Sequence, residues 1–315
     1  MDALLQILVL LAFMAGGAAL HLVKLSPKPK ITDLLIKAVL WALLFVMGFR
    51  LGNARELRDR LGEIGLLAVG TAVASIAGTI LMIWAGYALF DAVRGRHSGG
   101  KANATVVAAR IDIDWKHFKG PAVLLAVVII GFMVGAIAPE VALDYGLVTG
   151  WVLNALLFMI GLQFAQSGIS LKSAFVRADT AIVPVATLLG TLSGGLAVAA
   201  AFGLSAGKGL ALSAGFGWYS LAGVLISDLG DPALGSAAFL ANIVRESLAL
   251  VLIPVLAATK RPYAAIGVAG ATAMDVTLPL VEQCLGPDSV PVSFTSGAIL
   301  SLLVPVLVPL FYGLG

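Results

Sequence analysis

Three long stretches without a charged side chain constrain this 315-residue chain most. Residues 64–90, 180–207 and 289–315 contain no Asp, Glu, Lys or Arg. A helix of about 20 apolar residues crosses the hydrocarbon core of a bilayer, and each stretch is longer than that. Hydrophobic residues make up 60% of the chain and charged residues only 12%, whereas soluble domains have roughly 45–50% and 25%. The chain is therefore predicted to be an all-α membrane protein that crosses the bilayer several times.

The composition also argues against several classes of function. A single cysteine, Cys284, excludes a disulfide framework and a multi-cysteine metal site. The run GLSAGKGL at 203–210 lacks the spacing of a phosphate loop and has Gly209 where a Ser or Thr would bind magnesium. The polar centre has no Ser–His–Asp or paired-His arrangement, so we expect neither an enzyme nor a resident cofactor. The small net charge of +3 indicates no nucleic-acid partner.

Ten apolar segments follow one another along the chain. We read the first as a retained span, because Asp2 stands where a secretory signal carries positive charge. The ten segments are approximately 3–23, 34–52, 64–90, 120–138, 147–165, 180–204, 209–227, 233–258, 264–283 and 290–313.

Two of these segments differ from ordinary spans. Segment 209–227 places glycines among polar and aromatic residues, and segment 264–283 has Gly, Thr, Asp and Pro near its middle. Glycine and proline break helices, and a broken backbone at membrane depth persists only where protein or water satisfies it. Both segments are therefore predicted to be re-entrant or discontinuous helices, and the sequence leaves open which of the two they are.

The distribution of basic residues favours eight full spans and two hairpins that return to the side they left. With both termini outside, this topology places Lys260 and Arg261 in the cytoplasm together with the basic loop 91–119. Ten full spans would move that pair outside, and positive residues belong on the cytoplasmic side. The basic residues between 50 and 60 are an exception in either topology.

The second half of the chain contains an internal resemblance. AGFGWYS aligns with AGATAMD, and VLIPVL with VLVPLF, at an offset of about 55 residues. The units would be 209–258 and 264–313, each with one hairpin and one span, which makes the copies inverted. Inverted repeats whose broken helices meet near the midplane are typical of transporters; the alternative is a chance likeness of Gly- and Leu-rich segments. We therefore divide the chain into an amino-terminal region, 1–140, which holds four spans and the loop, and a transport region, 141–315.

Charged residues inside the predicted spans mark the candidate site. Glu246 and Arg245 lie midway along 233–258, and Asp275 lies in the middle of the second broken segment. A charged side chain at a helix centre costs about 2.5–3.5 kcal/mol on insertion scales, so we favour a substrate or proton role for both acids over internal pairing or helix capping. Arg245 is predicted to be either a structural clamp or a binder of the substrate carboxylate. Asn242 shares the helix face of Glu246.

Polar and aromatic residues around the two breaks complete the candidate site. Trp218 and Tyr219 are predicted to line a pocket, with an interfacial aromatic belt as the alternative. Ser220, Thr272 and Thr277 are candidates for the remaining hydrogen bonds to a substrate.

Three runs carry a family resemblance. GFGWYSLAGVLISDLGDPALGSAAFLANIVRE (215–246), GVAGATAMDVTLPLV (267–281) and VPVLVPLF (304–311) resemble the LysO-type lysine exporter family of bacterial inner membranes. The first 140 residues match that family only in apolar character and approximate number of spans. The resemblance implies eight transmembrane segments with both ends outside and export of L-lysine and analogues such as thialysine. It also implies two essential intramembrane acids, which correspond to Glu246 and Asp275.

The energetics of lysine export predict the coupling ion. An inside-negative membrane opposes the outward movement of a cation by about 2.3 kcal/mol per 100 mV, so net export requires an incoming ion. A low dielectric favours the protonated form of a carboxylate, which allows a buried acid to exchange a proton for the substrate ammonium. We therefore expect proton antiport with alternating access. A sodium-coupled carrier of an amino acid or organic anion, a channel and a membrane-embedded enzyme are the competing classes, and a homo-oligomer is left open.

Overall fold

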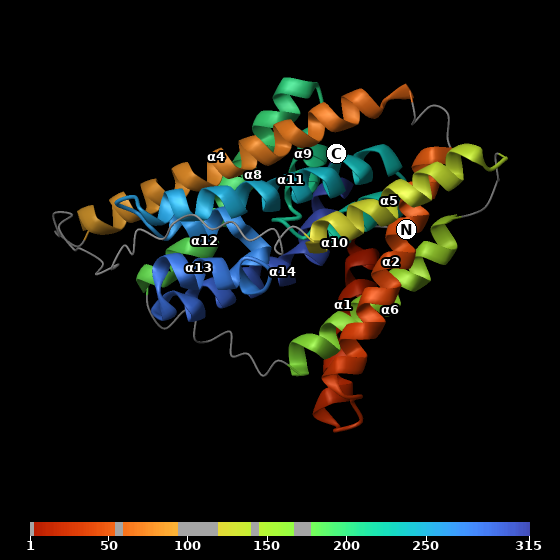
Figure 1. The fold of residues 1–315 in the computed structure, drawn as a ribbon, viewed down its shortest axis with the longest axis horizontal. Helices are drawn as coiled ribbons and strands as arrows, with labels where there is room; N and C mark the ends of the chain where they lie inside the picture. Colours follow the sequence, from red (N-terminus) through yellow and green to blue (C-terminus); the bar gives the residue numbers. More distant parts are fainter. Residues whose placement is uncertain (1–2, 54–58, 94–118, 140–144, 167–177) are drawn as a thin grey trace.

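The computed structural model describes residues 3–53, 59–93, 119–139, 145–166 and 178–315, and helices are the only regular elements in these residues (Figure 1). Eight of the described helices have 19 residues or more. They are α1 (Ala3–Leu22), α2 (Pro29–Asn53), α4 (Leu61–Val93), α5 (Lys119–Ile137), α6 (Tyr145–Gln166), α8 (Ala178–Phe202), α11 (Pro232–Ala257) and α14 (Val290–Gly313). The all-helical prediction is confirmed for this part of the chain. Most of the predicted loop 91–119 lies outside the described residues.

Several of these helices have the length and composition of membrane spans. Among the described residues, five stretches are long and apolar enough to cross a bilayer: Pro29–Asn53, Leu61–Val93, Ala181–Phe202, Pro232–Ala257 and Pro287–Gly313. Shorter apolar stretches lie within α1, α5 and α6.

The surface of α4 is apolar over most of its length. Leu66 is 65% exposed, and Val73, Leu81 and Trp84 are also exposed on this helix. A contiguous apolar surface of this kind marks a membrane or protein contact.

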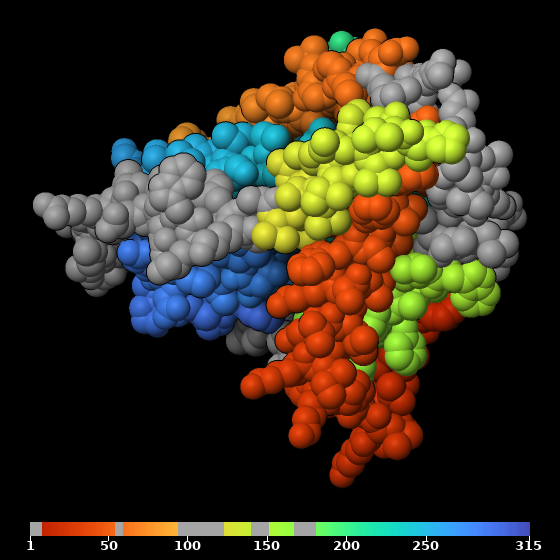
Figure 2. Space-filling view, turned by 45° about the vertical axis from the view of Figure 1, so that its right-hand side comes forward, coloured from red at the N-terminus to blue at the C-terminus, as the bar shows by residue number. Residues whose placement is uncertain are grey.

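Glycines bring pairs of long helices into close contact. A Cβ atom added to Gly131 or Gly135 of α5 would meet the backbone of Phe45 or Phe49 of α2. Gly190 of α8 lies in the same way against the backbone of α4. Figure 2 shows α5 lying directly on α2. Small residues let helix backbones approach in this way within membranes.

The first broken segment is a hairpin. Its two arms are α9 (Ala206–Ser213) and α10 (Tyr219–Asp228). Lys208, near the start of α9, places its Nζ atom 2.9 Å from a carboxylate oxygen of Asp231, which follows α10. The segment therefore returns to the end of the molecule at which it entered. The end of α14 is there as well, because Gly207 lies against Phe311 and Gly315; we call it the Lys208 end.

The second broken segment is a hairpin that enters from the opposite end. It consists of α12 (Ala264–Ala269), the 3₁₀ turn η2 (Gly270–Met274) and α13 (Leu278–Leu285), after which the turn η3 (Pro287–Ser289) leads into α14. Leu256 at the end of α11 shares one buried cluster with residues at the start of α12 and the end of α13. At this end, Arg261 donates a hydrogen bond of 2.6 Å to Asp91 of α4; we call it the Arg261 end.

The tips of the two hairpins meet inside the protein. The amide of Ala271 donates a hydrogen bond of 2.7 Å to the carbonyl oxygen of Phe216. Gly217 and Gly270 have positive φ angles of 106° and 65°, and Phe216 has a φ of 49°, in the left-handed region that non-glycine residues rarely adopt. The predicted breaks at 209–227 and 264–283 are thus present, and in the described structure the chain turns back at each of them.

Candidate substrate and proton site

Glu246 is a wholly buried acid without a hydrogen-bond partner. It lies on α11 with none of its surface exposed, and neither of its carboxylate oxygens has a partner in the described structure. A buried charge is normally paired or hydrogen-bonded, because removal from water costs several kcal/mol. An acid with two free oxygens is therefore equipped to take up a proton or a cation.

Asp275 lies in the break between η2 and α13. Its side chain is exposed, and one of its oxygens accepts a 2.6 Å hydrogen bond from the amide of Val276. Its charge interacts with that of Glu246, and both charges act on the side chain of Tyr219. Residues that are far apart in the sequence are thereby brought into one electrostatic group by the second hairpin, the first hairpin and α11.

Tyr219 begins the returning arm of the first hairpin. Its ring packs edge-to-face on Phe239 of α11 at 5.9 Å between centroids, and 9% of the residue is exposed. An edge-to-face pair fixes the orientation of a tyrosine ring. Trp218 precedes it at the amino-terminal cap position of α10 and packs against the main buried cluster. That these two aromatics line a substrate pocket stays a prediction.

Asn242 ties the tip of the first hairpin to α11. Its Oδ1 atom accepts a 2.6 Å hydrogen bond from the amide of Gly217, and its Nδ2 atom donates to Ala238. It lies one helical turn before Glu246, as the sequence predicts. Both polar atoms of Asn242 are engaged in holding the backbone, so its place in the structure is that of a support for the hairpin tip.

Arg245 makes no hydrogen bond to its neighbour Glu246 in the described structure. Its Nε and Nη2 atoms donate to the carbonyl oxygens of Val268 and Gly267, at 3.3 and 3.2 Å. Its Nη1 atom donates to the hydroxyl of Thr191 on α8 at 2.9 Å. The guanidinium therefore fixes the inner end of α12 to α8 and α11, and this geometry favours the predicted clamp over a carboxylate binder.

The remaining predicted site residues are buried near the two breaks. Thr272 donates to the carbonyl of Ala269 and Thr277 to that of Thr272, both at 2.9 Å, so the hydroxyls of this pair stabilise the second break. Ser220 is 3% exposed at the start of α10.

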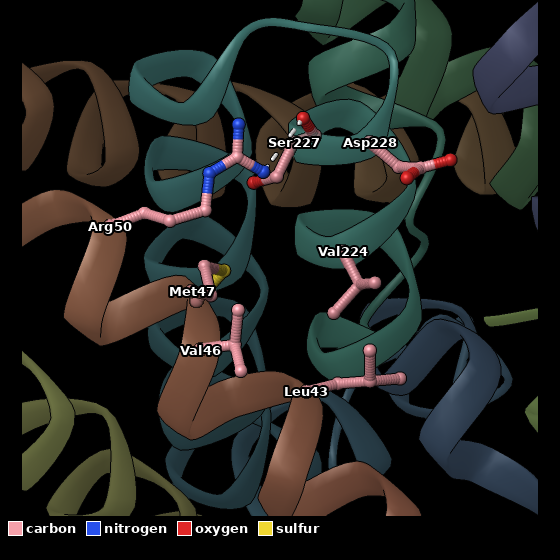
Figure 3. A pocket seen from close by; sticks show the side chains of 7 residues that line it. All are labelled: Leu43, Val46, Met47, Arg50, Val224, Ser227 and Asp228. Atoms are coloured by element: carbon pink, nitrogen blue, oxygen red, sulfur yellow. Dashed lines mark hydrogen bonds between the residues drawn. The ribbon is translucent and has the colours of Figure 1, made fainter. Parts of the chain in front are cut away.

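A separate pocket lies away from these residues. It is lined by the end of α10 and by α2, where Arg50 reaches the carbonyl oxygen of Ser227 at 3.5 Å and Asp228 also borders the pocket (Figure 3). Nine residues of helix separate Tyr219 from Asp228, or about 13 Å at 1.5 Å per residue. This pocket therefore belongs to the Lys208 end and not to the site around Glu246.

Residues that sequence reasoning missed hold the site in place. Phe216 joins the two hairpins through its carbonyl group, and Thr191 receives Arg245 from a different helix. Phe216 carries no polar side chain that would signal this contact. Thr191 is an ordinary threonine in an apolar span, and only the packing of α8 against α12 reveals its contact.

Comparisons with known proteins fit this arrangement. A family model described as "Lysine exporter LysO" matches residues 125–312, which include both hairpins and both acids. The chain belongs to the LysO lysine exporter family. It is 34% identical over 283 residues to "Lysine exporter LysO" of Escherichia coli K12, covering 90% of this chain and 91% of the relative.

A second relative comes from another bacterium. A Haemophilus influenzae protein described as "Putative lysine exporter" is 35% identical over 188 residues, which are 60% of this chain and 96% of the relative. No solved structure matches the chain. Membership of a family of exporters, together with its long apolar helices, makes the chain a multi-pass membrane protein of a transporter family.

Proposed function

We propose that this protein exports L-lysine, and close analogues such as thialysine, across the bacterial inner membrane, and that it is a transporter rather than an enzyme. Its two relatives are named as lysine exporters. The observation that carries the proposal is Glu246, a buried acid with two unpartnered oxygens one helical turn after Asn242, which bonds the tip of the first hairpin. An ionisable residue at such a place is by default a functional group.

The proposed topology has eight spans, two re-entrant hairpins and both termini outside. Its support is that α11 begins at the Lys208 end and α14 finishes there, while their hairpins enter from opposite ends. The two units, 209–258 and 264–313, would then form an inverted repeat, as in many secondary transporters. The Arg261 end is proposed to face the cytoplasm.

The proposed substrate site offers acids to the ammonium groups of lysine. Glu246 and Asp275 supply negative charge from two elements, and the Tyr219 side chain interacts electrostatically with both. The substrate carboxylate needs hydrogen-bond donors, and the start of α10 near Ser220 supplies free backbone amides. Asn242 and Arg245 position the site without binding the substrate, because their hydrogen bonds go to the backbone of the two hairpins.

The proposed cycle exchanges protons for lysine by alternating access. With the site open to the cytoplasm, both carboxylates are ionised and hold the lysine cation. With the site open outward, protons arrive on the same oxygens and lysine leaves. Exchange of one proton for one lysine moves no net charge, whereas exchange of two protons also uses the membrane potential of about 2.3 kcal/mol per 100 mV.

A cavity at the Lys208 end fits the outward path in this scheme. It has a volume of about 410 Å³ and lies between the start of α4, the end of α8 and the start of α11. Both signs of charge line it, as a zwitterionic amino acid with a cationic side chain would require. Its charged lining residues are Arg60, Glu63, Lys208 and Asp231.

Counterflow of labelled lysine in proteoliposomes tests the proposal. Purified protein should exchange internal for external lysine. A proton gradient with the acidic side outside should drive net export in sodium-free buffer. Lysine flux that depends on sodium and is indifferent to the pH gradient would instead support the sodium-coupled alternative. Conductance without counterflow would indicate a channel.

A further inference from the structure

The most unusual buried group outside the acid site is the guanidinium of Arg245. The residue is 2% exposed, and each of its three side-chain nitrogens donates a hydrogen bond to a neutral oxygen. Buried arginines in proteins are normally paired with carboxylates, because an uncompensated charge is costly. Here the acceptors are the carbonyls of Gly267 and Val268 and the hydroxyl of Thr191.

We call these three oxygens the oxygen cage; carbonyl and hydroxyl oxygens of this kind are also ligands that hard cations accept. The carbonyls belong to the inner end of α12, where the helix breaks; the oxygen of Gly267 also accepts from the amide of Gly270, so the hydrogen bond from Arg245 is its second. In transporters with broken helices, such unwound carbonyls and half-helix ends coordinate the coupling cation. The guanidinium of Arg245 therefore lies where a sodium ion would be expected in a carrier of this architecture.

A fourth oxygen borders the same cage. The hydroxyl of Thr187, one helical turn before Thr191 on α8, is fully buried and has no hydrogen-bond partner in the described structure. It lies 2.8 Å from the position that a Cβ atom would take on Gly267. Four oxygens, none of them charged, therefore lie around the three side-chain nitrogens of Arg245 at the end of α12.

We infer that Arg245 is a tethered cation, a positive charge fixed to the protein that fills an oxygen-lined site which would otherwise bind a monovalent metal ion. The inference deepens the proposed transport function and rests on it. Because the site is permanently filled, the carrier needs no sodium, and coupling is left to the acids. Arg245 acts as a positioning residue, since its Nη2 atom also lies close to Gly270, which contacts Phe216 of the other hairpin.

Removal of the tether tests the inference by chemical rescue. Arg245→Ala protein in proteoliposomes should lose lysine counterflow by about tenfold or more, because the inner end of α12 loses its hydrogen bonds to α11. Addition of millimolar methylguanidinium or sodium ions should restore part of the flux, whereas the neutral analogue methylurea should not. The matched control is Arg261→Ala, whose guanidinium is bound by the Asp91 carboxylate and whose loss should create no response to either cation.

A stability measurement separates this inference from the proposed function. The thermal unfolding temperature of Arg245→Ala in detergent should rise with methylguanidinium or sodium concentration, because a ligand that binds the folded state stabilises it. Wild-type protein should show no such rise. This readout needs no lysine transport, so it stands even if the transported substrate proves to be different.

Two conservative variants cover the case in which Arg245→Ala does not fold. Arg245→Lys keeps the positive charge and should retain more counterflow and a higher unfolding temperature than Arg245→Gln, which keeps only polarity. Equal behaviour of these two variants would overturn the inference, as would a folded Arg245→Ala protein that transports like wild type without added cation. Failure of methylguanidinium and sodium alike to affect folded Arg245→Ala would also overturn it.

Discussion

The hydrogen bond of 2.7 Å from the amide of Ala271 to the carbonyl oxygen of Phe216 joins the tips of two hairpins that enter from opposite ends of the protein. Backbone groups at membrane depth must be satisfied by protein or by water. Each tip is satisfied by the other tip and by one residue of α11, Asn242 on one side and Arg245 on the other. Movement of either hairpin therefore changes the environment of Glu246, which lies on the same helix.

Glu246→Gln is expected to abolish lysine export without lowering stability. The substitution keeps the shape of the side chain but removes its capacity to carry a proton or balance an ammonium group. Because the native carboxylate has no hydrogen-bond partner, loss of its charge removes a desolvation cost and leaves no ion partner unpaired. Export is measured by counterflow, and stability by the unfolding temperature in detergent.

The matched control for this prediction is Glu282→Gln on α13, where the acid is exposed. It should export lysine at the wild-type rate. Wild-type flux from the Glu246→Gln protein would remove this acid from the mechanism, and a fall in unfolding temperature would show that the carboxylate has a structural partner instead.

Asp275→Asn is expected to reduce export strongly while leaving the unfolding temperature unchanged. The side chain is exposed at the second break, so its substitution disturbs no packing, and the amide oxygen of Asn preserves the acceptor for the Val276 amide. What is lost is the negative charge that interacts with Glu246. Counterflow measured at increasing lysine concentration should then show a higher half-saturating concentration of lysine, as expected of weaker substrate binding. A half-saturating concentration and a maximal rate equal to those of the wild type would contradict this prediction.

The location of the broken helices was predictable from the sequence, but their contacts were not. Clusters of Gly, Pro and polar residues in otherwise apolar segments marked both breaks, because these residues disfavour continuous helix. Charge in an apolar span marked Glu246 and Arg245 in the same way. Which oxygens Arg245 reaches depends on how α8 and α12 pack, and the joining bond at Phe216 is made by backbone atoms, which leave no trace in residue type.

Asn242→Ala is expected to destabilise the first hairpin. The change removes the acceptor for the buried Gly217 amide, and an unsatisfied buried donor costs about 1–3 kcal/mol. Asn242→Asp keeps an acceptor oxygen and should retain more stability than Ala. Ser247→Ala is the control, because its hydroxyl bonds only within its own helix. Thermal unfolding in detergent ranks the three variants, and equal effects of Asn242→Ala and Ser247→Ala would contradict the predicted support of the tip.

Gly270→Ala is expected to prevent the hairpin tips from meeting. The residue has a φ of 65°, and a Cβ atom there would collide with the carbonyl oxygen of Phe216. The unfavourable backbone conformation costs about 1–3 kcal/mol, and the collision adds to it. Gly65→Ala in α4 is the control, since a Cβ there meets nothing within 4 Å and alanine favours helix. Counterflow and unfolding temperature should both fall for Gly270→Ala, and neither value should fall for the control. Wild-type counterflow and unfolding temperature in Gly270→Ala would show that contact between the hairpin tips is needed neither for transport nor for stability.

Thiol labelling from each side of the membrane should show that the two hairpins enter from opposite faces. In a Cys284→Ala background, Lys260→Cys probes the Arg261 end and Ala206→Cys the Lys208 end; both positions are exposed. An impermeant maleimide should label position 260 only from the cytoplasm and position 206 only from outside. If the first hairpin returns to the side it entered from, α11 is the one full span between the two positions, and they lie on opposite sides of the membrane. Labelling of both positions from the same side would require the first broken segment, 209–227, to cross the membrane, because it is the broken segment that lies between them.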